Sequence, residues 1–201
     1  MRHSFSTLAF ATSAALAAMA PATAVRAEMF DLETHQPLLV NPDRLQNGAE
    51  QPRESAVPRE TVAYKGPHGP GTILVSTSER RLYFVLPGGQ AIKYGVGVGR
   101  PGFEWSGAKT ITRKAEWPAW TPPAQMLRRR PDLPRHMEGG IDNPLGARAM
   151  YLGSSLYRIH GSNEPDTIGQ AVSSGCIRMT NDDVTDLYEH AKVGTKVVVI
   201  R

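Results

Sequence analysis

Residues 71–98, GTILVSTSERRLYFVLPGGQAIKYGVGV, indicate the fold most clearly. They contain three runs rich in β-branched and aromatic residues, at 72–76, 81–86 and 91–98. The segments between them, 78–80 and 87–89, have the composition of turns. Short strands about ten residues apart, separated by turn signals, predict an antiparallel sandwich or barrel.

The rest of the chain continues this mainly β pattern. Further strands are expected at 109–116, 148–152, 156–159 and 196–200. The clearest helix is expected at 181–192, with Asn181 as its cap and with Asp182 and Asp183 at its positive end. Gly194 is expected to end it. Its apolar residues recur at i, i+3, i+4 and i+7, which predicts one buried face: Val184, Leu187, Tyr188 and Ala191.

A long segment with little periodicity and several prolines lies at 117–146. Loops of this length inside a compact domain are usually functional or mobile, so it is a candidate lid or substrate wall. Trp117, Trp120 and Met126 are expected to pack it against the domain. Within it, Trp120 and His136 are the candidate lid residues, and His136 could approach a substrate.

The N-terminus has the three parts of an export signal. A short basic start is followed by an apolar run at 8–20, which is too short to span a bilayer comfortably. Small residues then allow cleavage after Ala24 or after Ala27, and an uncleaved membrane anchor is the alternative. We therefore expect a signal peptide at 1–27, an irregular leader at 28–69 and the main domain at 70–201. No later segment is apolar enough to predict a membrane span.

The net charge and the cysteine count limit which kinds of partner and chemistry are expected. The formal net charge of +4 over 201 residues is too small and too scattered to indicate a nucleic-acid partner. The densest basic run, 128–130, is interpreted as a solvated loop or as a contact to an anionic polymer. The chain has a single cysteine, Cys176, which cannot form an internal disulfide. A lone thiol in an exported protein calls for a functional explanation, with an inert buried thiol as the alternative.

The surroundings of Cys176 suit an acyl-transfer nucleophile. A thiol must lose its proton to attack a carbonyl, and an imidazole such as His160, at the end of a predicted strand, can accept it. Gly175 allows the tight turn that brings backbone N–H groups close to an oxyanion. No His or Cys cluster has the spacing of zinc ligands, and no cofactor is predicted.

The sequence motifs around His160 and Cys176 are more specific than the presence of a cysteine and a histidine alone. His160-Gly161-Ser162-Asn163 is followed, with fifteen residues between His160 and Cys176, by Ser173-Ser174-Gly175-Cys176-Ile177-Arg178. This arrangement resembles the L,D-transpeptidase catalytic domain family of the YkuD type. The runs at 96–100, 117–123 and 143–148 resemble its periplasmic ErfK/YbiS-like branch. The resemblance covers about two thirds of the chain, from residue 70 to residue 201.

The resemblance implies a YkuD-type β-sandwich or barrel with a loop lid and a short C-terminal helix, and a periplasmic enzyme that acts on peptidoglycan. Cys176 would attack the L-centre carbonyl of diaminopimelate in a tetrapeptide stem, D-alanine would leave, and an amine would resolve the thioester. His160 would transfer the protons. The N–H groups of Gly175 and Cys176 would hold the oxyanion. The amine would come from a second stem, an envelope protein or a free D-amino acid.

The resemblance leaves some roles open. Arg178 either holds a substrate carboxylate or braces the loop, and the Gly161 carbonyl can orient His160. Ser173, Ser174 and Asn181 are further candidates for substrate contact or loop bracing. Many relatives have histidine where this chain has Ser174, so a mechanism with two histidines is not expected. The alternatives are a hydrolase, in which water resolves the thioester, and a wall-binding module without chemistry.

Overall fold

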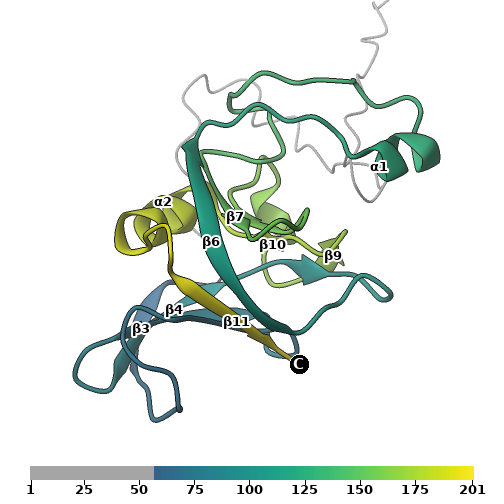
Figure 1. The fold of residues 1–201 in the computed structure, drawn as a ribbon. Coiled ribbons are helices and arrows are strands. Elements are labelled where there is room, and N and C mark those ends of the chain that lie inside the picture. Colours follow the sequence, from purple (N-terminus) through teal and green to yellow (C-terminus); the bar gives the residue numbers. More distant parts are fainter. Residues whose placement is uncertain (1–56) are drawn as a thin grey trace, which may run out of the picture.

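The computed structural model describes residues 57–201, which form a curled β-sheet around one helix (Figure 1). Expectations that concern residues 1–56, including the export signal and most of the leader, lie outside the described residues. The strands and helices follow in chain order: β1 (Glu60–Ala63), β2 (Ile73–Ser76), β3 (Arg81–Leu86), β4 (Gln90–Gly95), β5 (Val98–Gly99), β6 (Gly107–Glu116), α1 (Ala124–Arg129), β7 (Arg148–Leu152), β8 (Arg158–His160), the 3-10 turn η2 (Pro165–Thr167), β9 (Ala171–Ser173), β10 (Ile177–Arg178), α2 (Asn181–His190) and β11 (Lys196–Ile200).

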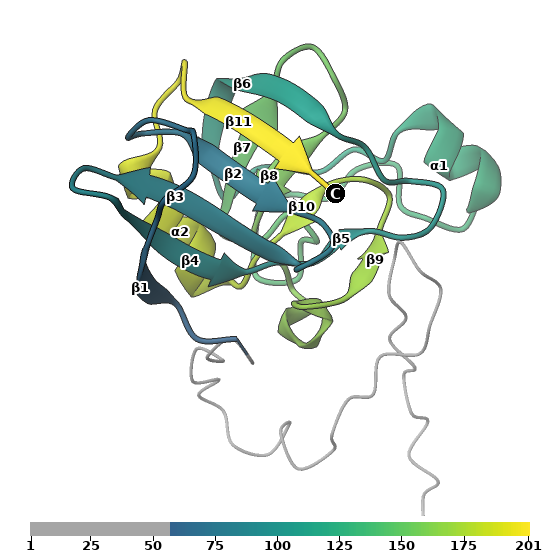
Figure 2. The same cartoon turned by 90° about the horizontal axis from the view of Figure 1, so that it is seen from below.

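Nine of these strands form one sheet in the order β1-β4-β3-β2-β11-β6-β7-β8-β10, and β5 pairs with β9 beside it (Figure 2). The sheet is mixed rather than purely antiparallel, because β11 runs parallel to β2 and β10 runs parallel to β8. The mainly β prediction is confirmed. The expectation of an antiparallel arrangement holds for most strand pairs but fails at these two and at β5–β9, which is also parallel. Parallel partners need a crossover connection instead of a hairpin, and other elements lie between the two strands of each of these pairs in the chain.

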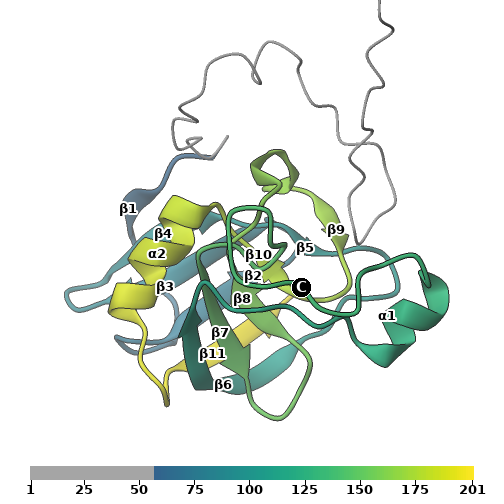
Figure 3. The same ribbon diagram turned by 90° about the horizontal axis from the view of Figure 1, so that it is seen from above.

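Helix α2 lies in the concave side of the curled sheet (Figure 3). Val184 and Leu187 are fully buried in the main hydrophobic core, together with residues such as Ile73 and Leu82 from the strands. Apolar burial of this kind is the main stabilising contribution in a domain of this size. The helix therefore shares one hydrophobic core with the strands that surround it.

Polar contacts attach both sides of α2 to the sheet. The Tyr94 hydroxyl on β4 donates to the Asp186 carboxylate at 2.6 Å. At the C-terminal end, the Lys114 ammonium from β6 donates to the carbonyls of Tyr188 and Ala191 at 2.5 and 2.7 Å. A cation is favourable at this end of a helix dipole. Burial lowers the pKa of Lys114.

Several predicted boundaries shift. The expected strand at 91–98 ends at Gly95, and Gly97 instead makes two backbone hydrogen bonds of 2.9 Å with Arg178. A Cβ at Gly97 would lie 3.1 Å from the Thr167 carbonyl oxygen, so glycine permits this close approach. The helix at 181–192 is shorter than expected and ends at His190. The expected irregular leader contains strand β1, which pairs with β4 at the edge of the sheet.

Within the described part of the chain, no helix is both long enough and apolar enough to cross a membrane.

Candidate active site

Two short parallel strands, β8 and β10, position the predicted nucleophile and base. Their register pairs Ile159 with Ile177 and His160 with Arg178. Side chains alternate between the two faces of a sheet. Because Ile159 and Ile177 are buried in the core around α2, His160 and the residue before β10, Cys176, are directed to the opposite face.

That face carries a cleft of about 420 Å³, and both His160 and Cys176 line it, together with Ser174. The long segment at 117–146 forms one wall. The segments at 102–104 and 155–158 form others. The cleft is lined by Gly102, Phe103, Glu104, Trp120, Pro123, Gln125, Met126, Arg129, Pro144, Leu145, Ser155, Leu156, Tyr157, Arg158, His160, Ser174 and Cys176.

The His160 ring is buried and oriented by its own chain. Nδ1 lies 2.6 Å from the Gly161 carbonyl oxygen, the contact expected from the sequence. A carbonyl can only accept a hydrogen bond, so this contact requires a proton on Nδ1. In the neutral imidazole, Nε2 then carries the lone pair. His160 is therefore held in the tautomer that can accept a proton at Nε2.

A tight turn presents Cys176. The thiol is half-buried, and Sγ lies 3.7 Å from the Leu156 carbonyl oxygen. The turn needs glycine at position 175, where φ is +104° and a Cβ would lie 2.6 Å from the Tyr157 ring. The hydroxyl of Ser173 spans the turn, because it accepts from the Gly175 N–H at 3.1 Å and donates to the Cys176 carbonyl at 2.6 Å. Ser173 thus braces the loop that carries Cys176.

A tryptophan distant in the sequence also fixes this turn. The Trp105 indole N–H donates to the Gly175 carbonyl at 2.8 Å. The indole stacks on Tyr157 with ring centroids 4.8 Å apart and planes inclined by 9°. Sequence reasoning missed Trp105, because nothing local to position 105 indicates a contact 70 residues away.

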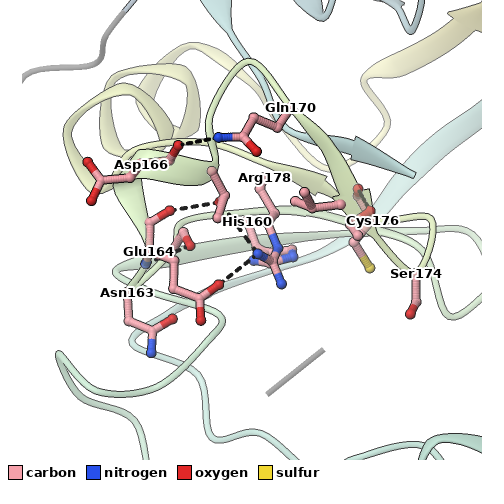
Figure 4. Close-up of polar contacts among 12 residues, drawn as sticks. His160, Asn163, Glu164, Asp166, Gln170, Ser174, Cys176 and Arg178 are labelled. Atoms are coloured by element: carbon pink, nitrogen blue, oxygen red, sulfur yellow. Dashed lines mark hydrogen bonds and ion pairs between the residues drawn. The ribbon is translucent and has the colours of Figure 1, made fainter. Parts of the chain in front are cut away.

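Arg178 is in a buried ion pair rather than in the cleft lining. Its guanidinium donates to the Glu164 carboxylate at 2.9 Å, and both side chains are at most 5% exposed (Figure 4). It also contacts the Thr167 hydroxyl at 3.4 Å. Of the two expected roles, these contacts correspond to bracing, here of the segment after His160. Glu164 was not singled out from the sequence, although a buried arginine requires a nearby acid.

Asn181 does not cap α2, which corrects the expectation. The N-cap is Thr180, whose hydroxyl accepts from the Asp183 N–H at 3.2 Å. Thr180 has the extended conformation of a cap, whereas Asn181 is already helical. The Asn181 side-chain oxygen instead accepts from the Ala147 N–H at 2.8 Å. Asn181 therefore fixes the end of the 117–146 segment near Gly161.

The 117–146 segment has a small core of its own, made by Trp120, Met126, Leu133 and Leu145. The packing expected of Trp120 and Met126 is confirmed, whereas Trp117 is 43% exposed. The ring of His136 contacts the Thr121 hydroxyl at 3.2 Å and Glu138 at 3.1 Å. These contacts place His136 on the exposed side of the segment, and it is not among the residues that line the cleft.

Between residues 57 and 201, no three His, Cys, Asp or Glu side chains are grouped in a way that could hold a metal ion. Besides its charged side chains, the cleft is lined by an imidazole that can accept a proton at Nε2 and by a thiol. Together they suit nucleophilic attack on a carbonyl.

Sequence comparison identifies relatives of this domain. The family model YkuD, described as the L,D-transpeptidase catalytic domain, matches residues 70–199. The probable L,D-transpeptidase ErfK/SrfK of Escherichia coli K12 is 40% identical over 137 residues, which are 64% of this chain and 43% of that protein. The probable L,D-transpeptidase YcfS of the same strain is 36% identical over 138 residues, again 64% and 43%. The matched region is therefore less than half the length of these relatives.

Solved structures show the same fold. An L,D-transpeptidase from Mycobacterium smegmatis aligns with a TM-score of 0.53 at 17% identity, covering 65% of this chain and 58% of that one. L,D-transpeptidase 3 from Mycobacterium tuberculosis also aligns with a TM-score of 0.53 at 17% identity, covering 66% and 62%. At this identity the likeness concerns the fold alone, and it agrees with the fold class predicted from the sequence.

Proposed function

The chain belongs to the YkuD family of L,D-transpeptidase catalytic domains, and from this premise we propose that it is an exported cysteine acyltransferase acting on tetrapeptide stems of peptidoglycan. The observation that carries the proposal is the shared cleft of Cys176 and His160. The hydrogen bond from His160 Nδ1 to Gly161 leaves Nε2 able to accept a proton in that cleft.

The first half-reaction forms an acyl-enzyme. His160 takes the thiol proton, and Cys176 Sγ attacks the L-centre carbonyl of diaminopimelate to give a tetrahedral oxyanion. When this intermediate collapses, the bond to the D-alanine nitrogen breaks. The protonated His160 gives its proton to the leaving amine. The stem remains attached to Cys176 as a thioester, and D-alanine departs.

The second half-reaction resolves the thioester. An incoming amine attacks the same carbonyl while His160 removes a proton from its nitrogen. The C–S bond then breaks, and the thiolate recovers the proton from His160. The acceptor amine belongs to a second stem, an envelope protein or a free D-amino acid, and each gives a different product from the same intermediate.

The oxyanion is assigned mainly to the Cys176 N–H. The Gly175 N–H, also expected as a donor, is engaged by the Ser173 hydroxyl at 3.1 Å. A second donor at Gly175 would therefore have to share its hydrogen with Ser173. Arg178 and Asn181 are assigned to positioning, because their contacts are to Glu164 and to Ala147.

Residues 1–27 are proposed to direct export and to be removed, which would place the enzyme in the periplasm of a Gram-negative-type envelope. N-terminal sequencing of the protein recovered from the periplasmic fraction tests this. A start at Val25 or at Glu28 corresponds to cleavage after Ala24 or Ala27, and an intact Met1 would contradict it.

Mass spectrometry tests the reaction directly. The wild-type protein, Cys176→Ala and His160→Ala are each incubated with purified tetrapeptide-stem fragments. We expect a stem adduct, with D-alanine lost, on the wild type alone, together with cross-linked or exchanged products. Hydrolysed stems would instead identify water as the acceptor. Binding without any adduct or product would refute the enzyme and leave a wall-binding module.

A further inference from the structure

Arg158 lies on the same strand as the proposed base, His160. It lies two residues before His160 on β8, so both side chains leave the same face of the sheet, about 7 Å apart along the strand. Both line the cleft. A permanent positive charge therefore stands beside the reacting groups.

The Arg158 side chain is held by aromatic packing. Its guanidinium lies 5.3 Å from the centre of the Tyr151 ring, and Tyr151 is its cross-strand partner on β7. Arg113 on β6 contacts the same ring at 3.6 Å. Contact with an aromatic face orients a guanidinium without neutralising it. Of these two arginines, only Arg158 lines the cleft.

The charge of Arg158 lacks a carboxylate partner within residues 57–201, in contrast to other arginines nearby. Arg148 pairs with Glu116 at 3.2 Å, and Arg178 pairs with Glu164. Arg158 has no ion pair there, and this is where it differs from Arg148; the buried Nε atoms of both arginines make no hydrogen bond to a described residue. A partly buried charge is retained most readily where a ligand supplies the opposite charge.

The other charges in the cleft add to this imbalance. Arg129, from α1, also lines it and contacts the Phe103 ring at 5.5 Å. The acid that lines the cleft is Glu104, whose carboxylate accepts from the Gly102 N–H at 2.8 Å. The cleft thus presents two arginines and one carboxylate, which favours an anionic ligand.

We propose that Arg158 is a carboxylate-binding residue of the cleft and holds a carboxylate of the peptide close to the bond that Cys176 attacks. The identification of the peptide as a stem rests on the proposed function. A tetrapeptide stem carries two carboxylates near that bond, one on the terminal D-alanine and one on the distal centre of diaminopimelate. Either offers the planar pair of oxygens that a guanidinium binds through two parallel hydrogen bonds.

Measuring binding in a variant that lacks the proposed nucleophile separates carboxylate recognition by Arg158 from any effect on the reaction. In the Cys176→Ala background, calorimetry measures the affinity for three tetrapeptides: the free acid, the C-terminal amide and the amide of the distal diaminopimelate carboxyl. In Cys176→Ala with Arg158 intact, we expect one of the two amides to bind about tenfold more weakly than the free acid. Arg158→Gln should weaken the free acid by the same factor and leave that amide unaffected. The insensitive amide identifies the carboxylate.

Arg113→Gln is the matched control, because it removes the other cation from the same Tyr151 ring and should leave all three affinities unchanged. Equal affinities of Arg158→Gln and its parent for the free acid would overturn the inference, as would an equal loss for all three peptides. If none of the peptides binds the parent, the inference falls together with the stem as ligand. If the wild-type protein forms adducts but Arg158→Gln binds the free acid and both amides with the affinities of its parent, the inference alone falls.

Discussion

The Trp105 indole donates a hydrogen bond of 2.8 Å to the carbonyl of Gly175, the residue before the proposed nucleophile. The peptide between Gly175 and Cys176 is trans, so its C=O and N–H point in opposite directions. Anchoring the carbonyl on Trp105 therefore directs the Cys176 N–H away from the indole. Because the Tyr157 ring holds the indole by stacking, the direction of this N–H is fixed before a substrate arrives.

Trp105→Phe keeps an aromatic ring against Tyr157 but removes the N–H donor. A preorganised donor contributes to catalysis because it need not reorient as negative charge develops on the substrate oxygen. We expect kcat for thioester formation to fall about tenfold, with KM nearly unchanged. The rate of Cys176 alkylation by iodoacetamide should keep its pH dependence, because His160 and its contacts are untouched.

Trp117→Phe provides the control, since it makes the same chemical change at an exposed tryptophan. Its kcat should equal that of the wild type. A wild-type kcat in Trp105→Phe, or a loss of alkylation in parallel with activity, would mean that Trp105 contributes only to packing.

The sequence predicted those parts of the molecule whose signals are local. The strands at 81–86, 148–152 and 196–200 were predicted with their observed bounds, because their mainly apolar runs are distinct from their neighbours. His160 and Cys176 could be proposed as base and nucleophile from the sequence because their motifs are compact. β1 was missed because three of the four residues in this edge strand are exposed, so no buried alternation marks it.

Other features depend on contacts between distant segments. Thr180 and Asn181 are adjacent and both can cap a helix, so only the backbone conformation decides between them. The contacts from Trp105 to Gly175 and from Arg178 to Glu164 depend on the curling of the sheet and on the pairing of β5 with β9. Local composition does not predict either feature. The positioning residues around the site were therefore harder to predict than the proposed nucleophile and base.

Glu164→Gln should destabilise the protein. The substitution keeps the shape of the side chain but removes the negative charge opposite Arg178 in an environment where both groups are at most 5% exposed. Breaking a buried ion pair on one side costs about 3 to 5 kcal/mol, because the remaining charge stays buried. The free energy of unfolding from urea titration measures this loss.

Glu116→Gln is the comparison for this change, because Glu116 pairs with Arg148 but is 61% exposed. We expect it to change the unfolding free energy by less than about 1 kcal/mol. Equal effects of the two substitutions would show that burial does not govern the Arg178 pair.

Asp183→Asn should alter the pH dependence of stability. Burial raises the pKa of the Asp183 carboxyl, and Asp186 and Asp182 raise it further, whereas the Thr180 hydroxyl and Arg59 lower it. An acid with a pKa above its unfolded value binds its proton more tightly in the folded protein. Its contribution to stability is therefore lost as the pH rises from below the unfolded pKa to above the folded pKa.

Urea unfolding at pH values from 3 to 7 tests this sign. The unfolding free energy of Asp183→Asn, relative to wild type, should increase as the pH rises through the titration of Asp183. Asp182→Asn removes a charge from the same helical turn at an exposed position and should show little of this trend. A difference that stays constant with pH would contradict the raised pKa.

Trp120→Ala should shift the products toward hydrolysis. Trp120 is buried in the small core of the 117–146 segment and also lines the same cleft as Cys176, so its ring fills space that water would otherwise occupy. A cleft wall that excludes water protects a thioester until an amine arrives. We expect the share of hydrolysed stems, measured by mass spectrometry with an excess of acceptor amine, to rise severalfold.

Leu133→Ala distinguishes the effect of losing the Trp120 ring from the effect of loosening the packing of the 117–146 segment. Leu133 belongs to the same small core but does not line the cleft. Both substitutions create a cavity, and each should lower stability by about 2 to 5 kcal/mol. The products are therefore compared at a temperature where circular dichroism shows both variants folded. A rise in hydrolysis in Trp120→Ala alone would assign water exclusion to the ring, whereas equal rises would assign it to the packing of the whole segment. An unchanged product ratio in both would mean that other walls of the cleft keep water from the thioester.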